Sequence, residues 1–79
     1  MPYIKQEQRT LNTLDAPENA GELNWAITSL IKNYFDRSAQ NYQAINDIVG
    51  ALDGAKAEFQ RRVVAPYEDK KIKENGDVY

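Results

Sequence analysis

Two runs of apolar residues at helical spacing constrain the fold of this chain most. Apolar residues recur three and four positions apart from Leu23 to Tyr34, and again from Ile45 to Val63. This spacing is typical of one face of an amphipathic α-helix. The polar connection 36–41 between the runs is short, which favours antiparallel neighbours. We therefore expect an all-α fold built on an antiparallel helical hairpin, about 20–36 and 41–65.

Local signals set the ends of the two helices. Asn19 has the side chain of an N-cap, and Glu22 completes the spacing of a capping box. Pro66 is expected to stop the second helix, because proline lacks an N–H and clashes with the preceding turn. The first helix is preceded by an N-terminal arm, 1–19, and the second is followed by a tail, 66–79.

The tail has two interpretations. Pro66 is suited to the first turn of a further short helix, and Glu68 and Asp69 would then favour its N-terminus. The alternative is an extended arm. In both cases Asn75-Gly76 predicts a turn. The last two residues, Val78 and Tyr79, are apolar, so we expect them to dock onto another surface.

Composition excludes several classes of protein. The 79 residues include no cysteine and no histidine, which excludes disulfides, Cys/His zinc sites, cysteine nucleophiles and Ser-His-Asp triads. One small domain fits this length, and short domains commonly need oligomerisation or a ligand to complete the core. We therefore expect a homo-oligomer.

The charge and hydropathy patterns predict where the protein is located and whether it binds membranes or nucleic acids. No apolar stretch is long enough to cross a membrane, and the first residues lack the apolar run of a signal peptide. A cytoplasmic protein without membrane contact is expected. The net charge of −2 argues against nucleic-acid binding, and such binding through the basic tail would have to be steeply salt-dependent.

A basic cluster near the end of the second helix is the candidate ligand site. Adjacent arginines form bidentate contacts with phosphate oxygens, and a tyrosine can stack against a base. The alternative is a solvated helix end, where basic side chains complement the helix dipole. The residues predicted to bind a phosphate-bearing ligand are Arg61, Arg62, Tyr67, Lys70, Lys71 and Lys73.

Small residues in the second helix are the candidate interface. Glycine inside a helix costs about 1 kcal/mol relative to alanine, so Gly50 and Gly54 need a compensating reason. Close approach of a partner helix, a subunit interface and a ligand against bare backbone are the alternatives. The predicted interface residues are Gly50, Gly54, Ala57, Val78 and Tyr79.

No arrangement of residues indicates catalysis. Glu68 and Asp69 are neighbours in sequence rather than acids converging across a cleft. The tail carboxylates could form a magnesium site, but nearby lysines and arginines would compete with the ion for them. The spacing of these carboxylates is not that of a calcium loop. We expect a non-enzyme with no cofactor and no metal.

Two stretches carry a family resemblance, GELNWAITSLI and INDIVGALDGAKAEFQRRVVAPYEDKKIKENGDVY, and the opening MPYIK fits it. They resemble a family of short phage, prophage and bacterial proteins of unknown function, which implies a setting rather than an activity. In size and architecture the chain is also similar to the anti-CBASS and anti-Thoeris sponges of phages, which trap nucleotide signals between subunits. No motif aligns with those sponges, so no binding residue carries over.

Two functions follow as expectations. The first is a non-catalytic homo-oligomer that sequesters a phosphate-bearing nucleotide signal, of the cyclic nucleotide or cyclic ADP-ribose type, to block host immunity against phage. The second is a small helical module that docks on a host or phage protein and binds no nucleotide.

Overall fold

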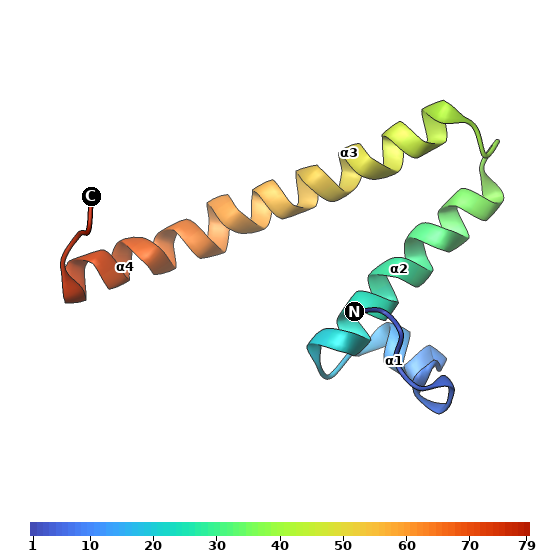
Figure 1. Ribbon diagram of the computed structural model, residues 1–79, viewed down its shortest axis with the longest axis horizontal. Coiled ribbons are helices and arrows are strands. Elements are labelled where there is room, and N and C mark those ends of the chain that lie inside the picture. The colour runs from blue at the N-terminus through green and yellow to red at the C-terminus, as the bar shows by residue number, and fades with distance from the viewer. The chain divides into compact units, whose positions relative to one another are not determined.

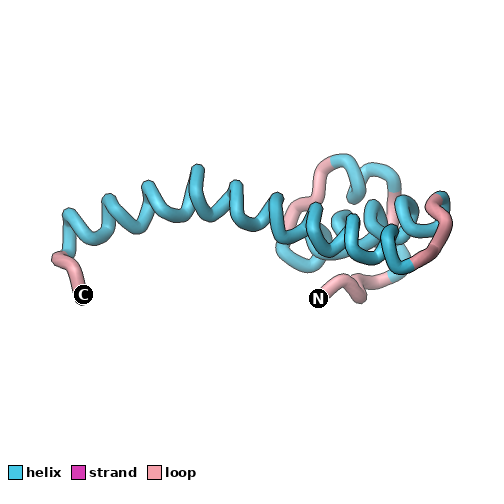
Figure 2. The backbone as a smooth tube through the Cα atoms, turned by 90° about the horizontal axis from the view of Figure 1, so that it is seen from above, coloured by secondary structure: helices cyan, strands magenta, loops and turns pink.

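The computed structural model describes residues 1–79, and all of its regular secondary structure is helical (Figures 1 and 2). The predicted all-α fold is confirmed. In chain order the elements are a 3-10 turn η1 (Gln6–Gln8), α1 (Leu11–Asp15), α2 (Ala20–Arg37), α3 (Tyr42–Phe59), a π turn (Gln60–Val64) and α4 (Ala65–Asn75). No helix combines the length and the apolar composition that crossing a membrane requires.

Helix α2 matches its prediction at both ends. The Asn19 side chain accepts a hydrogen bond from the Glu22 backbone N–H at 2.9 Å, so Asn19 is the N-cap. The Glu22 carboxylate in turn accepts from the backbone N–H of Glu18 at 3.0 Å, one residue before the cap. The N-cap is therefore formed as predicted, but the capping box is not, because the Glu22 side chain bonds the N–H of Glu18 and not that of Asn19.

The prediction that Pro66 stops the second helix is wrong. The chain stays helical from Tyr42 to Asn75, and a π turn immediately precedes the proline. In that turn the Ala65 backbone N–H donates to the Gln60 carbonyl, five residues back rather than four. The wider turn accommodates a residue that lacks an N–H and crowds the preceding carbonyl.

The tail is helical up to Asn75, which decides between its two interpretations. Glu68 lies in the first turn of α4, as expected for a helix that contains Pro66 at its start. Gly76 ends the helix with a φ of 91°, and its N–H donates to the Ile72 carbonyl. Glycine adopts a positive φ without the cost that a Cβ imposes. The helix thus ends at the predicted Asn75-Gly76 pair, but Asn75 is still helical and only Gly76 has a positive φ.

Contacts divide the chain into an N-terminal unit, Met1–Ile45, and a C-terminal unit, Asn46–Tyr79. In the N-terminal unit the arm folds back, and α1 packs against α2. A Cβ built on Gly21 would lie 3.3 Å from Cγ2 of Ile4, so glycine allows the close approach of the arm. Trp25 is half-buried on the same helix.

The turn between α2 and α3 completes the N-terminal unit. The Ser38 hydroxyl donates to the Phe35 carbonyl at 2.6 Å and accepts from the Gln40 backbone N–H at 3.0 Å. Asn41 accepts from the Ala44 backbone N–H at 3.0 Å and so caps the start of α3. Ala44 is the only buried residue of the chain.

The C-terminal unit is a single helical stretch followed by a short tail. It contains most of α3, the π turn and α4, and α4 contacts the π turn that precedes it. None of its side chains is buried, and only Ile48 and Val64 are partly covered. A lone helix has no second element against which to bury its apolar face.

Candidate interaction surface

The basic residues predicted as a phosphate clamp lie in two successive helical segments. Arg61 and Arg62 are in the π turn, whereas Tyr67, Lys70, Lys71 and Lys73 are in α4. All six are exposed. Arg61 and Arg62 are neighbours along a helical backbone, so their side chains diverge by about 80–100° and do not form one fork.

Two of these cations are already paired with carboxylates of the same helix. Arg61 donates to both Glu58 oxygens, at 3.1 and 3.2 Å. Lys71 lies 3.3 Å from Glu74, and its ammonium is 5.6 Å from the centre of the Tyr67 ring. Exposed pairs of this kind contribute about 0.3–0.5 kcal/mol. The i,i+3 and i,i+4 spacings that create them are visible in the sequence.

The remaining cations, Arg62, Lys70 and Lys73, form no ion pair in the structure. They are the part of the predicted site that is available to an outside anion or carboxylate. The structure gathers Tyr67 and Lys71, but it does not bring all six predicted residues together. Ligand binding by these six residues stays a prediction.

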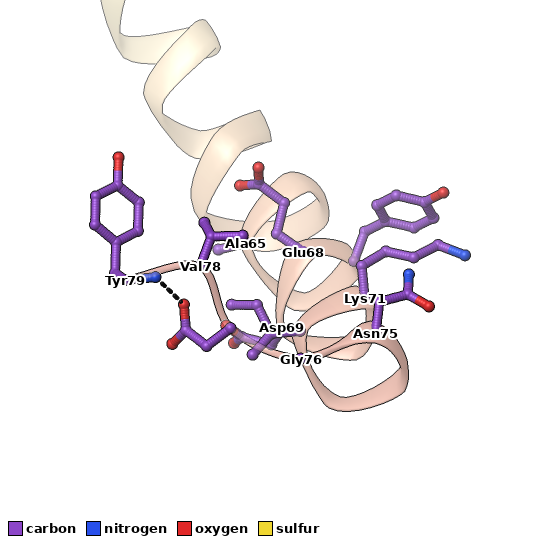
Figure 3. Close-up of a pocket in the computed structure, with 11 residues that line it drawn as sticks. Ala65, Glu68, Asp69, Lys71, Asn75, Gly76, Val78 and Tyr79 are labelled. Carbon is purple, nitrogen blue, oxygen red and sulfur yellow. Dashed lines mark hydrogen bonds between the residues drawn. The ribbon is translucent and has the colours of Figure 1, made fainter.

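A shallow surface lies between α4 and the tail (Figure 3). Its lining includes Val78 beside Ala65, with Lys71 and Asn75 projecting on the far side of the helix from Tyr79 in this view. The Tyr79 backbone N–H donates to Asp77 at 2.9 Å. Val78 and Tyr79 have exposed fractions of 92% and 113%, so their own unit does not cover them, and their docking onto another surface stays a prediction.

The small residues of α3 lie in open space. A Cβ built on Gly50 or Gly54 meets nothing within 4 Å, and Ala57 is exposed. At about 100° per residue, these three positions lie on the side of α3 opposite Leu52 and Phe59. Nothing within the C-terminal unit therefore packs against the two glycines, and the predicted interface of Gly50, Gly54 and Ala57 stays a prediction.

An apolar stripe, in contrast, runs along the length of the C-terminal unit. Its central residues are far from buried, with exposed fractions of 41% for Leu52, 59% for Phe59 and 60% for Tyr67. The stripe consists of Ile48, Val49, Leu52, Ala55, Phe59, Val63, Val64 and Tyr67. Sequence spacing predicted it as far as Val63.

The π turn extends the stripe into α4. One extra residue in a helical turn rotates everything after it back by about 100°. In an uninterrupted α-helix Tyr67 would lie about 80° away from Phe59 around the helix axis. With the π turn at Gln60–Val64 it lies nearly in line with Phe59. Sequence reasoning missed Val64 and Tyr67 as stripe residues because it ended the helix at Pro66.

A second apolar surface lies within the N-terminal unit. The α2 residues Leu23, Ile27 and Leu30 have exposed fractions of 51%, 42% and 69%. Together with Leu14 and Pro17 they line a shallow groove beside the arm. Both units therefore carry an apolar surface that their own packing leaves open.

Comparison with known proteins gives a family but no activity. The chain matches one protein family over residues 1–78, described as a domain of unknown function (DUF6899). No curated protein and no solved structure matches it.

Proposed function

Because that match spans nearly the whole chain, the protein belongs to this family of unknown function, and we propose that it is a non-catalytic helical module that binds protein chains through its apolar stripe. One observation carries the proposal: the C-terminal unit has an apolar stripe from Ile48 to Tyr67 and no buried side chain. Exposed apolar patches of this kind mark sites of protein interaction.

The chemistry of the stripe suits another helix. Helix-in-groove and helix–helix recognition use apolar anchors three, four and seven positions apart. Leu52, Phe59 and Tyr67 have these spacings once the π turn is taken into account. Phe59 and Tyr67 are the largest of these anchors, and aromatic residues are enriched among those that dominate binding energy. A host or phage protein is the kind of partner that the family resemblance suggests.

The test compares two lysine substitutions on opposite faces of α3. Phe59→Lys places a charge in the stripe, whereas Asn46→Lys places the same charge at an exposed position on the opposite face. We expect the first variant to lose capture of protein partners in a pull-down and the second to keep it. Equal capture by both variants, with helical content unchanged in circular dichroism, would contradict a role for the stripe.

Sequestration of a phosphate-bearing nucleotide signal, as in a phage sponge, is the second candidate. The observation that favours it is the presence of Arg62, Lys70 and Lys73 without a carboxylate partner. Native mass spectrometry with cyclic nucleotides and ADP-ribose derivatives distinguishes the two candidates. A discrete ligand mass that disappears in the double variant Arg61→Ala/Arg62→Ala would establish sequestration. Protein assemblies without any added mass would favour the interaction module.

A further inference from the structure

We propose that the occupant of the apolar stripe is a second copy of this chain, laid antiparallel along the C-terminal unit. The inference rests on the proposed function, since it takes the stripe as a protein-binding surface. It adds the partner, the orientation and the approximate crossing point. Three features of the chain support it: the reach of its own helices, the distribution of charge and the position of the π turn.

The chain cannot cover the whole stripe with its own residues. Helical structure runs from Tyr42 to Asn75, which is about 50 Å at 1.5 Å per residue. Helix α2 has 18 residues, or about 27 Å, and a four-residue turn joins it to the start of α3. Even fully antiparallel to α3, α2 would end near Phe59. The arm is already packed on α2, so Val64 and Tyr67 need a surface from outside the chain.

Charge along the C-terminal unit favours an antiparallel second copy. Residues 46–59 carry three acidic side chains and one basic one, a net charge of −2. Residues 60–73 carry five basic side chains and two acidic ones, a net charge of +3. An antiparallel pair places each acidic segment beside a basic segment, whereas a parallel pair places like charges together. Complementary charge selects orientation and partner.

If the two copies cross near residue 60, their apolar stripes contact each other and their oppositely charged segments lie side by side. Glu58 and Arg62 lie on the same flank of the stripe, and Arg62 has no carboxylate partner in its own chain. A two-fold antiparallel pair that crosses there places Glu58 of each copy beside the second copy's Arg62. Glu58 already accepts from Arg61 of its own chain, and a carboxylate has acceptor sites left for a second cation. Two-fold contacts are isologous, so each such pairing occurs twice. The π turn, with Val63 and Val64, lies at the centre of the contact.

Cross-linking tests the orientation, because the chain has no cysteine of its own. Ala51 and Lys70 lie on one flank of the stripe and are about 28 Å apart within one helix, too far for a short cross-linker. Mixed Ala51→Cys and Lys70→Cys proteins should form cross-linked dimers, and neither variant alone should do so efficiently. Efficient cross-linking of Ala51→Cys to itself would overturn the antiparallel arrangement.

Sedimentation equilibrium tests the occupant. The full chain should have twice its 9.0 kDa mass. Phe59→Lys should raise the dissociation constant by about 30-fold or more, as expected for a central aromatic anchor. Asn46→Lys, at an exposed position on the other face of α3, should change it less than about threefold. A monomer at all concentrations would overturn the inference. If the chain is a monomer, but Phe59→Lys loses capture of a different protein and the control variant does not, the proposed function stands without the dimer.

Discussion

At the residue scale, Gly50 and Gly54 test whether the back of α3 is an interface. Each is in a helix interior with nothing within 4 Å of a built Cβ, and each costs the helix about 0.5–1 kcal/mol relative to alanine. In the double variant Gly50→Ala/Gly54→Ala we expect the free energy of unfolding to rise by about 1–2 kcal/mol. Urea unfolding followed by circular dichroism measures it.

The matched control is Ala57→Gly on the same face, which should lower stability by a similar amount per residue. If the glycine face contacts another chain, the added methyl groups instead weaken assembly. A lower stability of the double variant, together with a smaller assembled mass, would thus support the predicted interface of Gly50, Gly54 and Ala57. Until then that interface stays a prediction.

At the element scale, helix α2 was predictable because its signals are local. The Asn19 cap, the Glu22 spacing and the apolar periodicity all lie within the helix or one residue of it. The end of the second helix was not predictable in the same way. Pro66 is a strong local stop signal, but the π turn before it removes the clash and lets the helix continue to Asn75.

In the candidate site, too, local sequence signals predicted some features and missed those that depend on the π turn. The basic residues between Arg61 and Lys73 were visible as a cluster, and the local pairs that occupy Arg61 and Lys71 follow from their spacing. The alignment of Tyr67 with Phe59 did not follow from spacing, because it depends on one extra residue in the π turn. An error of one residue in a helical turn moves a side chain to another face.

Replacing Pro66 tests the structural role of the π turn. In Pro66→Ala the N–H is restored and a regular α-helix becomes favourable, which would rotate Tyr67 by about 80–100° away from Phe59. We expect helical content to stay the same or rise while association through the stripe weakens. Circular dichroism and sedimentation measure the two quantities. Pro17→Ala, outside the helices, is the control. Unchanged association in Pro66→Ala would contradict the assignment of Tyr67 to the stripe.

At the scale of the whole molecule, the two units differ in how far they are stabilised by their own contacts. The N-terminal unit has an arm packed on α2, a hydrogen-bonded turn and the one buried residue, Ala44. The C-terminal unit has backbone hydrogen bonds within one helical stretch and side-chain contacts that are local and exposed, among them Glu58–Arg61, Lys71–Glu74 and Lys71–Tyr67. Helices in proteins gain most of their stability from tertiary packing, so we expect the C-terminal unit to depend more on a partner.

This difference predicts two separable unfolding transitions. Trp25 is the only tryptophan and lies half-buried in the N-terminal unit, so its fluorescence reports that unit alone, whereas circular dichroism reports both. If association stabilises the C-terminal unit, dilution should remove helical signal first and leave Trp25 fluorescence nearly unchanged. The midpoint of the helical transition should also rise with protein concentration, because association favours the folded state by mass action. Coincident transitions at every concentration would instead mean that the two units fold as one body without a second chain.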